Sequence, residues 1–369
     1  MIFELQPNIY LDTFCMLASI IIVIYNYKNV LVNNDPSSGT GYVFLGCFIL
    51  LFSLLYRPEE SDFWHYLNGY ELGRSMDVDI MEEFYYRLME FIPDNYILWR
   101  TAIWGPAAII IVITFKRLHI NSGIGTIMFL CFALTNTYYY TRNCLSLSLL
   151  YLGMVILGSE SIESKIKKYI IFGLLAYVAF FLHKSVPLYI AIILIATIIP
   201  LNRKTLIMMA VMFPVLYGVI LVLASNILLL NFWNESTINR AEIYMESEAR
   251  SSTLFGIISL LIHYAPVFYF LYIAIKDYLY NSKSKTNETN IHYKNFLIAT
   301  LLLVYVSFLV SGQMSMIQGR FYGSAMAPLT FAACIYFENN WKNRKCVNMI
   351  NIYLLSFAWN AFETLVLKK

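Results

Sequence analysis

Four long stretches of this 369-residue chain contain no charged side chain. They cover residues 42–56, 205–230, 295–319 and 321–337. A helix needs about 20 apolar residues to cross the hydrocarbon core of a bilayer. Within that core, only helices and closed barrels satisfy the hydrogen bonds of their own backbone. Because these stretches are continuously apolar and do not alternate, they predict membrane-spanning helices.

The scarcity of charge over the whole chain excludes several classes of protein. Only 13% of the residues are Asp, Glu, Lys or Arg, and 59% are hydrophobic, whereas a soluble domain carries about 25% charged residues. So few charges do not cover a water-facing surface, which excludes an ordinary soluble enzyme and a disordered protein. The net charge of +3 also gives no sign of a nucleic-acid partner.

The apolar runs therefore predict an all-α, polytopic integral membrane protein. We expect a single membrane domain over residues 1–369 with about 12 transmembrane helices, within a range of about 10 to 13. The segments that meet at Arg142 and at His183 are each either two short helices or one broken helix. The expected helices cover residues 9–26, 41–57, 98–116, 123–140, 142–158, 168–183, 185–200, 205–228, 254–275, 294–311, 320–337 and 347–366.

The distribution of Lys and Arg predicts which helix ends face the cytoplasm. If the N-terminus lies outside and the spans alternate, most basic residues fall in inside loops, in agreement with the positive-inside rule. The inside basic residues are mostly lysines, whereas the outside ones are mostly arginines. The outside arginines are Arg57, Arg74, Arg87, Arg100, Arg142, Arg240, Arg250 and Arg320.

An outer face rich in arginine indicates a site for an anion, because a guanidinium binds phosphate or carboxylate through two parallel hydrogen bonds. The alternative is that these side chains reach toward the membrane surface and pair with acids in their own loops. Arg142 and Arg320 fit that alternative least, because they adjoin apolar runs with no acid nearby. A charge at such a position is a functional hypothesis by default.

Two long loops are expected outside the membrane, over residues 57–97 and 229–253. The first contains an amphipathic helix that lies flat on the membrane or caps a cavity. Acidic residues such as Glu83 and Glu90 occupy its polar face. Its apolar face is expected to hold Ile80, Phe84, Leu88 and Phe91, supported by Met81, Tyr85 and Ile92.

The usual motifs for phosphate, zinc and nucleophilic serine sites are absent from the sequence, and we expect no metal and no cofactor. Four clusters of polar residues remain as candidates. They are the loop with Arg57, Asp62 and Tyr66, the segment from Tyr138 to Asn143, the junction from His183 to Ser185, and the polar stretch from Ser311 to Gly323.

Several of these elements occur in the same order in the EpsG-like family of bacterial membrane proteins, which is similar to the Wzy-type polysaccharide polymerases. The resemblance spans about residues 40–340 of this chain. This chain departs from the family pattern at two places. It has no Gly just before Asp62, and it has Cys144 where a Gln or Gly often follows the Arg. The elements that carry it are Arg57 with Asp62 and Tyr66, Glu82-Glu83 with Tyr86, Arg142 at the start of an apolar helix, His183-Lys184-Ser185, and Arg320-Phe321-Tyr322.

This resemblance implies a GT-C-like architecture in the bacterial inner (plasma) membrane, with an extracytoplasmic active site. It implies a glycosyltransferase that passes a glycan from polyprenyl pyrophosphate to a hydroxyl of a second lipid-linked repeat unit. The implied partners are these lipid-linked oligosaccharides and membrane lipid, together with chain-length regulator and flippase proteins of the same pathway.

The roles of individual residues follow from this reaction. Arg142 and Arg320 would stabilise the charge on the leaving pyrophosphate. The base would be His183, Asp62 or Glu83, with His183 first because histidine titrates near neutrality. The remaining residues are expected to bind substrate: Arg57, Lys184, Gln313 and Tyr322 as polar contacts, and Trp64, Tyr66 and Tyr139 along the glycan path.

Two other functions remain open on the sequence. A ligase would pass the glycan to a different acceptor, and the sequence does not separate it from a polymerase. A transporter would also be apolar with cavity-lining arginines, but it would more often show an internal repeat, and none is visible here.

Overall fold

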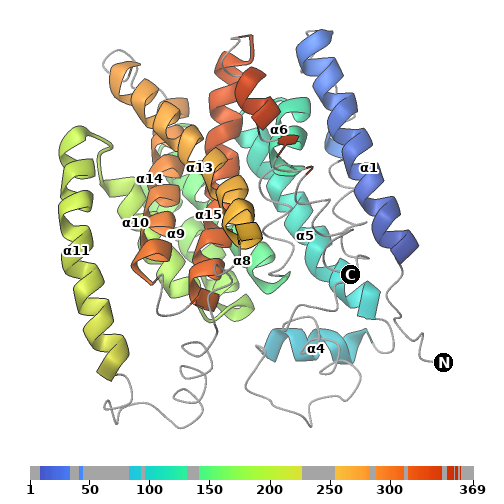
Figure 1. Cartoon of the computed structure of the whole chain (residues 1–369). Coiled ribbons are helices and arrows are strands. Elements are labelled where there is room, and N and C mark those ends of the chain that lie inside the picture. Colours follow the sequence, from blue (N-terminus) through green and yellow to red (C-terminus); the bar gives the residue numbers. More distant parts are fainter. Residues whose placement is uncertain are drawn as a thin grey trace.

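The part of the chain that the structure describes is helical, with no β-strand in it (Figure 1). The structure is a computed structural model and describes residues 9–33, 41–44, 83–92, 96–130, 141–226, 254–281, 288–310, 315–342, 347–352, 354–355 and 358. The all-α class expected from the sequence is confirmed.

The helices agree closely with the apolar runs of the sequence. Their bounds are α1 (Ile9–Tyr27), the π-helix η1 (Lys28–Val32), α4 (Glu83–Phe91), α5 (Tyr96–Arg117), α6 (Ser122–Met128), α8 (Thr141–Gly158), α9 (Lys165–Leu182), α10 (Val186–Ile198), α11 (Arg203–Asn226), α13 (Leu254–Asn281), α14 (Glu288–Leu309) and α15 (Ser315–Asn340).

Three helices begin at least three residues earlier than the apolar runs predict. Helix α9 begins at 165 instead of 168, α14 at 288 instead of 294, and α15 at 315 instead of 320. The reason is that backbone hydrogen bonding continues into the polar residues that flank an apolar run. The junction at His183 is resolved as two separate helices, since α9 ends at Leu182 and α10 begins at Val186.

Aromatic rings join the central helices into one core. Phe331 of α15 stacks on Phe296 of α14 at 5.0 Å between ring centroids and meets Phe115 of α5 edge-on at 5.4 Å. Helices α8 and α9 approach closely at Gly153, where an added Cβ would lie 2.7 Å from the ring of Phe172. Aromatic side chains of this size each bury about 150–250 Å² of surface in a core.

Two of the described helices are long and apolar enough to cross a membrane. They are Leu98–Arg117 in α5 and Glu288–Leu309 in α14. Helix α11, at the left edge of the bundle in Figure 1, and helix α9 also expose large apolar side chains. On α11 these are Ile207, Met208, Val211, Met212, Val215 and Val219, and on α9 they are Ile166, Tyr169, Ile170, Leu174, Tyr177, Val178, Phe180 and Phe181.

The amphipathic helix of the first long loop is present as α4, and its expected apolar face is buried only in part. Tyr85, Tyr86 and Met89 are buried, whereas Phe84 and Phe91 are exposed. Of the expected apolar face, Tyr85 therefore packs inward, and Leu88 is partly buried against the core. Trp99 at the start of α5 holds Tyr85 inward, because its indole N–H donates to the backbone oxygen of Tyr85 and its ring packs edge-on against the Tyr85 ring.

Three contacts show that several helices run in the same direction. The end of α10 meets the start of α14, because Lys294 donates to the backbone oxygens of Thr197 and Ile199. The last residue of α8, Gly158, lies against the His292 ring of α14.

The third contact joins Asn121, just after α5, to Glu338 near the end of α15. These contacts lie at one end of the bundle, which we call the far end. Helices α5, α8, α10 and α15 therefore all begin at the other end, which we call the site end. In Figure 1 the site end is the lower end, where α4 lies across the bundle.

Candidate functional site

The turn between α9 and α10 is the best-described part of the site end. His183 ends α9 in an extended backbone conformation, and Ser185 precedes the first residue of α10. The backbone N–H of Ser185 donates to Nδ1 of His183 at 3.0 Å, and the Ser185 hydroxyl lies 2.5 Å from the same nitrogen. Lys184 between them is exposed, and His183 is half-buried. The turn thus fixes the imidazole ring beside an exposed cation.

A buried hydrogen bond places this turn level with the start of α15. The hydroxyls of Tyr189 in α10 and Ser324 in α15 lie 2.7 Å apart. Ser185 lies four residues before Tyr189, and position 320 lies four residues before Ser324. Since α10 and α15 run in the same direction, both lie about one helical turn, or about 5.4 Å, beyond this bond. The structure therefore brings the His183 turn and the backbone at position 320 to the same level of the bundle.

The start of α5 contributes a buried cation to the same end. Arg100 is 5% exposed and is the one buried Arg, Lys, Asp or Glu among the residues whose side chains the structure describes. It follows Trp99, which holds α4 in place. In the sequence Arg100 was one of several outside arginines, and nothing there distinguished it from the others. Its position in the first turns of an apolar helix is like that of Arg142 and Arg320, but Asp94 lies six residues before it, so no sequence signal set it apart.

The remaining predicted site residues are described only in part or not at all. Tyr322 is buried in α15. Glu83, Arg142 and Arg320 have helical backbones at the starts of α4, α8 and α15, and the structure does not describe their side chains. Six others lie outside the described residues, namely Arg57, Asp62, Trp64, Tyr66, Tyr139 and Gln313.

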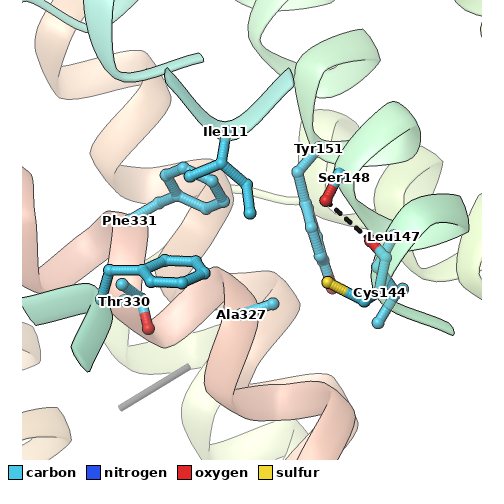
Figure 2. A pocket seen from close by; sticks show the side chains of 9 residues that line it. Ile111, Cys144, Leu147, Ser148, Tyr151, Ala327, Thr330 and Phe331 are labelled. Carbon is cyan, nitrogen blue, oxygen red and sulfur yellow. Dashed lines mark hydrogen bonds between the residues drawn. The ribbon is translucent and has the colours of Figure 1, made fainter. Parts of the chain in front are cut away.

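A small cavity between α5, α8 and α15 is not the substrate site (Figure 2). The space in it that is open to the centre of a water-sized sphere is about 20 Å³, which is room for about one water molecule. Ser148 and Thr330 line it, but each hydroxyl donates to a backbone oxygen of its own helix. The cavity is therefore apolar and too small for a sugar.

The part of the chain that the structure describes is all-helical, and two of its helices are long and apolar enough to cross a membrane. The sequence model of the EpsG family matches residues 40–367, so this chain belongs to the EpsG family. Membership implicates it in exopolysaccharide biosynthesis. No curated protein and no solved structure matches the chain.

Proposed function

We propose that this chain is a multi-pass polysaccharide polymerase of the plasma membrane, with its active site at the site end. It transfers a glycan from polyprenyl pyrophosphate to a hydroxyl of a second lipid-linked repeat unit. Membership of the EpsG family supports the pathway. The observation that carries the site is the Tyr189–Ser324 bond, which sets the His183 turn level with position 320.

The charge distribution supports an extracytoplasmic site end. The far end carries lysine-rich segments, such as Lys165, Lys167 and Lys168 at the start of α9 and Lys116 at the end of α5. The positive-inside rule assigns such an end to the cytoplasm. The apolar side chains exposed on α9 and α11 suit contact with lipid, because soluble monomers rarely expose contiguous apolar patches larger than a few hundred square ångströms.

The proposed reaction needs few protein groups. The bond between the anomeric carbon and the pyrophosphate oxygen breaks, and a new bond forms to the acceptor hydroxyl oxygen. Arg142 and Arg320 bind the pyrophosphate as it gains charge, the task for which bidentate guanidinium groups are suited. A base takes the proton of the acceptor hydroxyl. Lys184 adds a positive charge at the same end, and aromatic loop residues line the path of the glycan.

Reconstitution with purified substrate tests this proposal. The protein is placed in vesicles with lipid-pyrophosphate repeat units, and the products are resolved by glycan length. We expect a ladder of products that grow by whole repeat units. A single product on an added non-glycan acceptor would favour a ligase. Movement of the lipid between leaflets with no longer glycan would show a transporter and contradict the proposal.

A further inference from the structure

The two hydrogen bonds between Ser185 and His183 determine where the imidazole carries its proton. The backbone N–H of Ser185 lies 3.0 Å from Nδ1 with hydrogen-bonding geometry. A backbone N–H only donates, so Nδ1 accepts and carries no proton. The Ser185 hydroxyl, 2.5 Å from the same atom, then donates as well. The proton of the neutral ring is therefore on Nε2.

The hydroxyl of Ser185 is not used in the way that a serine before a helix usually is. Such a serine caps the helix by accepting a backbone N–H from its first turn. Ser164 does this at the start of α9, where its hydroxyl accepts from the backbone N–H of Lys167 at 3.3 Å. Ser185 makes no capping bond to α10. Its hydroxyl bonds His183 instead, which indicates a role in orienting the ring.

We propose that Ser185 is a positioning residue that holds His183 as a hydrogen-bond donor from Nε2 to an anionic oxygen of the leaving pyrophosphate. This inference rests on the proposed function and deepens it by separating the donor from the base. In the neutral ring the basic nitrogen is Nδ1, and Ser185 occupies it. The base is then a carboxylate, Asp62 or Glu83.

The step balances with this assignment. The acceptor oxygen bonds to the anomeric carbon, and its proton passes to the carboxylate. The electron pair of the broken carbon–oxygen bond stays on the pyrophosphate. His183 keeps its Nε2 proton throughout and shares it in a hydrogen bond that strengthens as the phosphate oxygen gains charge.

The location of the ring suits a phosphate contact. His183 precedes exposed Lys184 in the turn, and the turn is level with position 320 of α15, the place of Arg320. An Nε2–H donor in the same turn as Lys184 is complementary to a pyrophosphate.

Nitrogen NMR tests the tautomer without any assay of activity. The chain is labelled with ¹⁵N-histidine, and the His183 signals are assigned by their loss in His183→Gln. We expect the unprotonated shift at Nδ1 and the protonated shift at Nε2 near neutral pH. The reverse pattern would overturn the inference. In Ser185→Ala the Nδ1 shift should move because one of its two donors is gone, and Ser185→Thr should restore it.

The glycan ladder tests the role in the reaction. Glutamine places an amide N–H near the position of Nε2 but accepts no proton. We expect His183→Gln to keep at least about a tenth of the wild-type rate and His183→Ala to lose about 100-fold. Equal losses in the two variants would overturn the donor role, because a base cannot be replaced by an amide.

Serine variants complete the test. Ser185→Ala should slow the ladder about fivefold to tenfold, in line with one lost hydrogen bond, and Ser185→Thr should recover most of the rate. Ser164→Ala, which removes a true helix cap, is the matched control and should leave the rate unchanged. If the wild-type chain makes no ladder, the proposed function fails, and the tautomer still upholds or overturns the positioning by Ser185.

Discussion

The two ends of the helix bundle hold their polar side chains in different ways. At the far end, polar groups bond to complete the helix ends: Lys294 donates to the last carbonyls of α10, and Glu338 accepts from Asn121, which precedes α6. At the site end, Ser185 leaves its own helix uncapped and bonds a histidine instead. Far-end contacts thus serve stability, whereas site-end contacts orient side chains. Changes at the two ends should therefore affect different measurements.

The largest expected effect is on activity at the site end. Arg142→Lys and Arg320→Lys should each lower the rate of glycan elongation by about 100-fold or more, because a lysine keeps the charge but not the paired donors. The unfolding midpoint in detergent should stay within about 2 °C of wild type. Retained activity in both variants would contradict the role of these arginines.

The next largest expected effect is on stability, at the far end. Glu338→Ala removes the acceptor for the backbone and side-chain N–H groups of Asn121. The free energy of unfolding should fall by about 1–3 kcal/mol, the cost of leaving partly buried donors unpaired. Chemical denaturation measures this change, and the elongation rate per folded molecule is the control. A loss of elongation rate with unchanged stability would contradict the stabilising role of Glu338.

Lys294→Met should have a smaller effect of the same kind. The ammonium group of Lys294 lies 3.2 Å and 3.3 Å from the oxygens of Thr197 and Ile199, and methionine keeps most of the apolar chain. We expect a loss of about 1 kcal/mol in the free energy of unfolding. The contradicting outcome is an elongation rate that falls while the denaturation midpoint stays at the wild-type value.

The smallest expected effect is a dependence of stability on pH. Glu338 lies just beyond the expected span 320–337, and burial raises its pKa above the usual 4.5 although the two N–H groups of Asn121 lower it. The folded chain therefore binds this proton more tightly than the unfolded chain. The contribution of Glu338 to stability is full below pH 4.5 and is lost as the pH rises through the raised pKa.

Thermal unfolding from about pH 4 to pH 7 measures this dependence. The stability of wild type relative to Glu338→Gln should fall as the pH rises. Parallel curves for the two proteins would show that the pKa of Glu338 is not raised.

Much of the fold was predictable because continuous apolar runs leave little choice. The run at 98–116 became α5 (Tyr96–Arg117), and the run at 142–158 became α8 (Thr141–Gly158). The break at His183 was also visible, since a polar pair interrupts two apolar runs and Pro187 favours a helix start.

The packing of particular faces was not predictable. Helix α4 offers two apolar faces, one with Phe84 and Phe91 and one with Tyr85, Tyr86 and Met89. The periodicity of α4 does not predict which of the two faces is buried. The contact between Trp99 of α5 and Tyr85 determines it. Likewise, Tyr189 and Ser324 are 135 residues apart, and no local pattern pairs them. The base remains a prediction: Asp62 lies outside the described residues and the structure does not describe the side chain of Glu83.

The most direct test of the central claim is the sidedness of the reaction. Membrane vesicles of both orientations are prepared, and repeat units on a shortened, water-soluble prenyl chain are added only to the outside. Glycan ladders should form in vesicles that expose the site end, with α4 and the His183 turn, and Arg320→Lys should abolish them. Ladders only in vesicles that expose the far end, with Lys294 and Glu338, would contradict the account.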